Sequence, residues 1–174
     1  MAHLSRQAVE ARANKLLGSL NIDQIPVPVE KIAKSLGARV RFSPLDDELS
    51  GFVFVKNGVP IIGVNSLHHP NRQRYTIAHE LGHLELHRQL ITSEVHVDKK
   101  FPVLMRDPTS ASGTELIEIQ ANQFAAELLM PRTLIEQALD KKEFDIDDDG
   151  PIEQLAKKFR VSKQALEYRI RNRP

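Results

Sequence analysis

The chain has 174 residues, of which 41% are hydrophobic and 27% are charged, and its formal net charge is +1 at pH 7. This composition is typical of a globular protein with one hydrophobic core, and the small net charge excludes an overall electrostatic attraction to nucleic acid or membranes. The sequence contains no cysteine, which excludes disulfides, thiolate metal sites and cysteine nucleophiles. Any metal ion must therefore be held by imidazole, carboxylate or amide oxygen.

The first forty residues predict two helices and a strand. Apolar residues recur at helical spacing over residues 5–19, and charges interrupt this stretch too often for a signal peptide or a membrane span. We therefore expect a cytoplasmic protein. A second helix over residues 29–36 ends at Gly37, and residues 38–42 alternate as a strand.

The middle of the chain predicts a hairpin followed by a long helix. In SGFVFVKNGVPIIGVNS, residues 50–66, Asn57 and Gly58 separate two runs rich in valine, isoleucine and phenylalanine, which is a strong signal for a two-residue hairpin turn. The period becomes helical over residues 71–89. Residues 91–111 are mixed in character and predict a long loop with short structured pieces at most.

The last third of the chain predicts further helices and a charged linker. Residues 112–115, Ser-Gly-Thr-Glu, have the spacing of a capping box and introduce a helix that ends at Met130. Another helix is expected over residues 133–139. We expect one domain over residues 1–140, with an acidic linker and a basic tail over residues 141–174 packed on the same domain.

The stretch HELGHLELH, residues 79–87, is the candidate site for chemistry. His79 and His83 are four residues apart on a predicted helix, so their rings project from one face within ~6 Å and can share a small cation. Glu80 lies ~100° around the helix, where it can take the proton of a water molecule that the metal activates. Chance predicts roughly 0.02 such motifs in a chain of this composition. The alternative is that both histidines are ordinary residues of the helix surface or core edge, held by hydrogen bonds.

A catalytic zinc ion needs a third protein ligand. His87 lies ~12 Å along the helix axis from His79, too far to share the ion with both histidines, so we expect it to orient or pack against them. In TELIEIQANQFAAELLMP, Glu118 and Asn122 are four residues apart, so the carboxylate can bind the ion while the amide orients a histidine ring. Glu115, one turn earlier, is the rival ligand, unless it only completes the capping box.

Two motifs together resemble a known family. The run RQRYTIAHELGHLELH, followed later by EIQANQFAAELLMP, is similar to the ImmA/IrrE family of zinc metallopeptidases. The preceding IPVPVEKIAKSLGARVRF and the hairpin that ends in GVNS also resemble this family, so the likeness covers most of the chain. Gln120 stands where the family frequently has an acidic residue.

The resemblance implies a site, a fold and a substrate. It places Zn2+ on His79, His83 and Glu118, with Glu80 as the general base. It implies an α+β, zincin-like metallopeptidase domain with a small antiparallel sheet and an active-site helix, in which the exposed edge of the hairpin pairs with an extended substrate. Members of the family cleave helix-turn-helix repressors, so such a repressor is the expected substrate.

The basic tail IEQLAKKFRVSKQALEYRIRNR resembles a helix-turn-helix, with a break near Arg160 and Ser162 as the cap of the second helix. Four basic residues are candidates for phosphate contacts, and we expect any nucleic-acid contact through them to be weak: Lys163, Arg169, Arg171 and Arg173. The favoured alternative is that the two helices pack on the peptidase core and present a solvated basic face. No membrane partner is expected.

Two functions follow from these patterns. The leading one is a cytoplasmic, zinc-dependent endopeptidase that cuts a regulatory protein. The alternative is a DNA-binding or antitoxin-like regulator without proteolytic activity, in which the metal is structural. Glu80 favours the first, because a structural site needs no base beside the metal. The group that stabilises the oxyanion is left open among five candidates: Tyr75, His68, His69, His96 and Tyr168.

Overall fold

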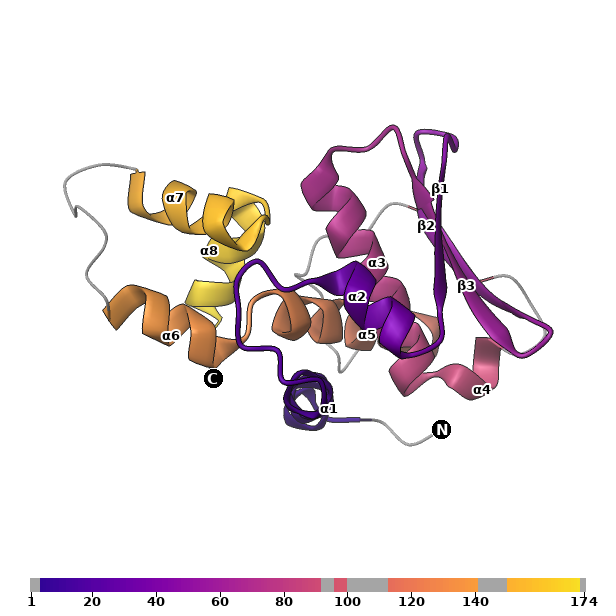
Figure 1. Cartoon of the computed structure of the whole chain (residues 1–174), viewed down its shortest axis with the longest axis horizontal. Coiled ribbons are helices and arrows are strands. Elements are labelled where there is room, and N and C mark those ends of the chain that lie inside the picture. The colour runs from indigo at the N-terminus through magenta and orange to yellow at the C-terminus, as the bar shows by residue number, and fades with distance from the viewer. Residues whose placement is uncertain (1–3, 92–95, 100–112, 141–149, 173–174) are drawn as a thin grey trace.

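The computed structural model describes residues 4–91, 96–99, 113–140 and 150–172. In chain order its elements are α1 (Arg6–Ser19), α2 (Val29–Ser35), β1 (Arg39–Ser43), β2 (Leu49–Lys56), β3 (Val59–Asn65), α3 (Pro70–Leu86), α4 (Arg88–Ile91), β4 (His96–Lys99), α5 (Gly113–Leu129), α6 (Arg132–Asp140), α7 (Gly150–Phe159) and α8 (Lys163–Arg171). The sheet lies at one end, α3 and α5 in the middle and α6 to α8 at the other end (Figure 1). The predicted mixture of helices and strands is confirmed.

The sheet has four strands in the order β1-β3-β2-β4. β2 and β3 form the predicted hairpin, and Asn57 (φ 51°) and Gly58 (φ 78°) both have the positive φ that a type I′ turn requires. The prediction of an antiparallel sheet is wrong in one respect, because β1 pairs with β3 in parallel. β3 returns from the hairpin into the space between β1 and β2, so the first two strands do not pair with each other.

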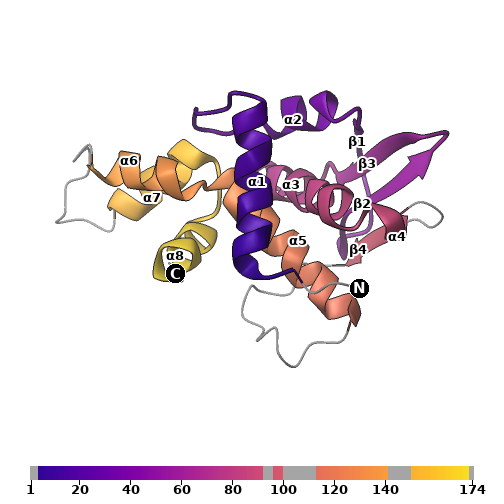
Figure 2. The same cartoon turned by 90° about the horizontal axis from the view of Figure 1, so that it is seen from below.

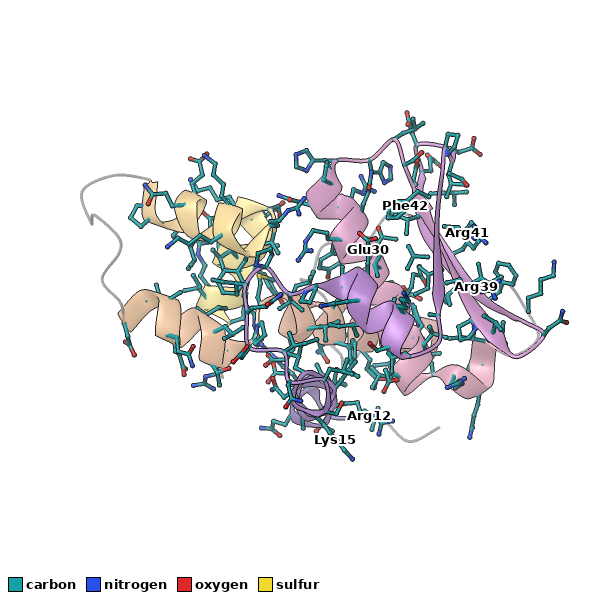
Figure 3. All side chains as sticks on the ribbon, viewed as in Figure 1. Arg12, Lys15, Glu30, Arg39, Arg41 and Phe42 are labelled. Atoms are coloured by element: carbon teal, nitrogen blue, oxygen red, sulfur yellow. The ribbon has the colours of Figure 1, made fainter. Side chains whose placement is uncertain are left out.

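The expected free edge of the hairpin is occupied. β2 is antiparallel to β3 on one side and to β4 on the other, with Phe52 opposite Val97. The edge strands within the described part of the chain are therefore β1 and β4, and a peptide that paired with β2 would take the place of β4. On β1, Arg39 and Arg41 are exposed (Figure 3), and charged side chains at a sheet edge discourage pairing with another chain.

Helix α3 lies between the sheet and α5, so it is buried on two faces. Figure 2 shows α1 crossing α5, and the two helices are in contact. Side chains of the sheet, α3 and α5 form one buried cluster, in which each large residue contributes ~1.5–3 kcal/mol relative to exposure. Among its members are Val53, Ile62, Ile77, Leu81, Phe124 and Leu128. Every helix in the described residues is too short or too polar to cross a membrane.

The two predicted C-terminal helices are present. α7 and α8 are joined at residues 160–162, where Arg160 has a left-handed φ of 54° and the Ser162 hydroxyl accepts a hydrogen bond from the Ala165 N–H at 3.1 Å. Lys163 and Arg171 are exposed, while Arg173 lies outside the described residues. The predicted helix pair with Ser162 as its cap is therefore confirmed.

Contrary to the prediction, the side chain of Arg169 does not face solvent. Its side chain is 8% exposed and forms ion pairs with Glu10 (3.1 Å) and Glu127, and its Nε donates to the Met130 carbonyl. Burial opposes ionisation of Glu10, but hydrogen bonds from Arg6 and Arg169 outweigh this and hold the pKa of its carboxyl below the ordinary value. The prediction of a phosphate contact through Arg169 is wrong, because an arginine enclosed by carboxylates ties α8 to α1 and α5 instead.

Candidate metal centre

Helix α3 carries the HELGH stretch through the interior of the protein. The helix begins at Pro70, where the His69 Nδ1 accepts a hydrogen bond from the Asn71 N–H at 3.2 Å. Residues 76–84 are all buried, because the sheet covers one face of the helix and α5 covers another. His79 and Glu80 are each 0% exposed and His83 is 1% exposed, which rules out an ordinary solvated helix face.

Three donor groups converge between α3 and α5. The Nε2 atoms of His79 and His83 lie 2.9 Å apart, and the Glu118 carboxylate lies 3.2 Å from the first and 3.4 Å from the second. A tetrahedral ion bound at 2.0–2.2 Å has donors about 3.3–3.6 Å apart. The two distances to Glu118 are close to this range, whereas the 2.9 Å between the imidazole nitrogens is shorter, so a bound ion would require the two rings to lie slightly further apart. The donor types suit a small divalent cation held by two imidazoles and one carboxylate.

The later helix brings one of the two acidic candidates to the histidines. α5 brings Glu118 to both histidines, and Glu115 is not part of this group. Ser112, the other half of the predicted capping box, lies outside the described residues. Within the described part of the chain, Glu118 is thus the acidic residue of α5 that meets the histidines.

Asn122 is hydrogen-bonded to the first histidine. Its Oδ1 lies 3.0 Å from the His79 Nδ1 and accepts the proton of that nitrogen, since a carbonyl oxygen cannot donate. The opposite ring nitrogen, Nε2, is left with its lone pair directed at the cluster. The Tyr75 hydroxyl donates to the same Oδ1 at 3.1 Å.

Glu80 lies on the side of α3 that faces the sheet. On β2, Gly51 is close to it: a Cβ added at Gly51 would lie 2.4 Å from the Thr76 Cγ2, 2.6 Å from the Gly63 carbonyl oxygen and 3.6 Å from the Glu80 Oε1. The missing side chain at Gly51 lets the strand backbone approach the Glu80 carboxylate closely. The sequence reasoning did not identify Gly51, although glycine inside a predicted strand is a signal of close backbone approach.

His87 is outside the cluster, as predicted, and has its own partner. Its Nε2 lies 2.9 Å from the Gln120 Oε1, and the Gln120 side-chain amide donates to the Leu4 carbonyl at 3.1 Å. Its ring centroid is 5.6 Å from that of His83. Gln120 therefore links the end of α3 to the residues that precede α1, which the sequence did not predict.

Gly82 sets the distance between α3 and α5. A Cβ at this position would lie 3.1 Å from both the Ala121 Cα and carbonyl oxygen, and 3.3 Å from the Phe124 Cβ. We expect Gly82→Ala to push the helices apart, lower the stability by ~1–3 kcal/mol and weaken any metal binding by the cluster, because Glu118 is carried by the displaced helix. Thermal unfolding and chelator competition measure the two effects.

Gly18→Ala is the matched control, because nothing lies within 4 Å of a Cβ at Gly18. This variant should keep the metal affinity of the wild type. If Gly82→Ala binds metal as tightly as Gly18→Ala does, the packing distance at Gly82 does not govern the cluster.

Comparison with known proteins decides the family. Residues 33–171 match the peptidase family M78, described as the IrrE N-terminal-like domain. The chain belongs to this family. The family is one of metallopeptidases, so the predicted resemblance to ImmA/IrrE proteins is confirmed.

Two proteins illustrate the relationship of this M78 family member to others. The radiation response metalloprotease IrrE of Deinococcus radiodurans is 30% identical over 140 residues, which cover 77% of this chain and 37% of IrrE. A Mycobacterium tuberculosis transcriptional regulator has the same fold, with a TM-score of 0.67 and 17% identity over 97% of this chain and 48% of that one. The chain thus spans less than half the length of either protein.

Proposed function

We propose that this chain is a zinc-dependent endopeptidase that hydrolyses a peptide bond in a regulatory protein. The observation that carries the proposal is the convergence of His79, His83 and Glu118, with the buried carboxylate of Glu80 on the adjacent position of α3. Three protein ligands leave a fourth position open, as catalytic zinc sites do and structural ones do not. Two imidazoles and one carboxylate also suit zinc better than the all-oxygen cations.

The proposed ligands are His79, His83 and Glu118. A bound zinc ion supplies Lewis acidity, which makes water a nucleophile near neutral pH and polarises the carbonyl that it attacks. Asn122 holds the His79 ring by its Nδ1 proton, so that the ring does not rotate away from the cluster.

Glu80 is the proposed general base. Its carboxylate takes a proton as water adds to the carbonyl carbon, and returns that proton to the amide nitrogen as the C–N bond breaks. The products are a carboxylic acid and an amine, and no covalent bond to the protein forms. Burial between α3 and the β2 backbone keeps the carboxylate at one position for both transfers.

The substrate we propose is a helix-turn-helix transcriptional repressor, and the location is the cytoplasm, where such repressors act. Membership of the M78 family and the 30% identity to a radiation response metalloprotease support this choice. The proposed domain is zincin-like over residues 1–140, with residues 141–174 packed on it as a helix-turn-helix-like segment. The ion pairs of Arg169 with Glu10 and Glu127 support that packing.

The alternative is a regulator that binds DNA without cutting protein. Two of the predicted phosphate contacts, Lys163 and Arg171, are exposed, so we retain weak nucleic-acid contact as a secondary property. The buried Arg169 removes one contact from that surface. Glu80 beside the ligand His79 argues for catalysis, since a structural ion needs no base there.

Metal content and cleavage test the function together. The purified protein is expected to hold one zinc ion per chain and to cut a repressor encoded near its own gene at a defined bond, identified by mass spectrometry. Removal of zinc by a chelator should stop cleavage and its return should restore it. Cleavage that persists in the chelator, or a protein that binds no stoichiometric metal, would contradict the proposal.

A further inference from the structure

Tyr75 lies one helical turn before His79 on α3, so both side chains project toward the same part of α5. The Tyr75 hydroxyl donates to the Asn122 Oδ1 at 3.1 Å, and the His79 Nδ1 donates to the same oxygen at 3.0 Å. Two donors from α3 therefore meet one acceptor from α5. Asn122 is 5% exposed, so these contacts are shielded from water.

This arrangement determines which way the Asn122 amide faces. A carbonyl oxygen has two lone pairs, and here each of them receives a proton. If the amide rotated by half a turn, its NH2 group would face the His79 Nδ1–H, donor against donor, and that hydrogen bond would be lost inside the protein, while the Tyr75 hydroxyl would have to turn and accept instead of donate. Without the Tyr75 hydroxyl, the Asn122 oxygen keeps only its hydrogen bond from His79, and the contact that holds the amide from its other side disappears.

We propose that Tyr75 is a positioning residue, whose hydroxyl fixes the Asn122 amide and, through it, the His79 ring and its zinc-binding nitrogen. The hydroxyl has one proton, which is donated to Asn122 instead of to the oxyanion of a substrate. The proposal rests on the proposed function in one respect, namely that His79 is a zinc ligand. If Tyr75 has this role, it is not the oxyanion donor, and the other candidates for that donor remain.

A positioning role and an oxyanion-donor role of Tyr75 predict opposite results for Tyr75→Phe. Loss of a partner that orients a metal ligand weakens metal affinity about 10–100-fold. Tyr75 contacts Asn122 and not the ligand itself, so it is one hydrogen bond further from the metal, and we expect zinc affinity to fall by a smaller factor of ~3–10. At saturating zinc, kcat should stay within about threefold of wild type. Removal of an oxyanion donor would instead lower kcat ~10²–10³-fold and leave zinc affinity unchanged.

A second variant tests the mechanism by which Tyr75 acts. In Asn122→Asp both side-chain oxygens accept hydrogen bonds, so rotation of the group no longer exchanges an acceptor for a donor. We therefore expect Tyr75→Phe to cost about 3–10-fold in zinc affinity in the wild-type background and less than about twofold in the Asn122→Asp background. Tyr168→Phe, on α8, is the matched control and should leave zinc affinity unchanged.

The experiment uses the full chain, with zinc affinity from chelator competition and kcat from repressor cleavage. An unchanged zinc affinity in Tyr75→Phe overturns the proposal, and so does an equal loss in both backgrounds. Zinc affinity is measured without turnover. A wild type that binds zinc but cleaves no repressor therefore contradicts only the proposed peptidase function, whereas a wild type that binds no zinc contradicts both that function and the positioning role of Tyr75.

Discussion

Glu80→Gln is expected to lower kcat for repressor cleavage by ~10²–10⁴-fold while the protein keeps its full complement of zinc. Glutamine has nearly the shape of glutamate, so the close packing of Gly51 against this side chain is preserved. The glutamine amide cannot take a proton from water, so it also has no proton to return to the leaving amine. Single-turnover cleavage and metal analysis of the same sample measure the two quantities.

Glu85→Gln provides the control for this variant. Glu85 is on the same helix, half-buried, and its carboxylate contacts Arg12 at 3.4 Å, away from the cluster. We expect wild-type kcat and zinc content in this variant. Cleavage by Glu80→Gln at the wild-type rate would show that Glu80 is not the general base. Loss of zinc from that variant would instead indicate that Glu80 is a zinc ligand.

Glu118→Ala is expected to weaken zinc binding by more than ~100-fold, because even partners that merely orient a ligand cost 10–100-fold. Its carboxylate lies 3.2 Å and 3.4 Å from the two histidine nitrogens, and among the residues that the structure describes no second acidic side chain belongs to the cluster. Zinc should raise the unfolding temperature of the wild type and leave that of Glu118→Ala nearly unchanged, since a ligand stabilises only a state that binds it.

Glu115→Ala is the control on the same helix, and it should bind zinc as the wild type does because Glu115 is not part of the group of potential ligands. Chelator competition and calorimetric unfolding with and without zinc provide the measurements. The reverse outcome, with zinc lost in Glu115→Ala and kept in Glu118→Ala, would exchange the two roles.

Much of the local structure could be predicted from the sequence. The apolar periods of α1, α3 and α6, the Asn57-Gly58 turn and the Ser162 cap depend on residues a few positions apart, and all of them are present. The placement of His79 and His83 on one face is also local, because a spacing of four brings side chains together on any helix.

Pairings between distant segments were predicted less well. The parallel pairing of β1 with β3 and the pairing of β4 with β2 were not expected, because periodicity identifies a strand and not its neighbour. Arg169 was expected in solvent, since nothing near it in the sequence reveals the two carboxylates that enclose it.

The amino-acid sequence by itself determined the helices, the hairpin and the identity of the chemical groups, because these depend on side-chain type and on spacing along one element. It also narrowed the third member of the cluster to Glu118 or Glu115. Only the tertiary structure decided between them, by packing α5 on α3 at Gly82 so that Glu118 reaches both histidines. The same packing placed Asn122 between Tyr75 and His79, and this contact forms only when two distant helices meet.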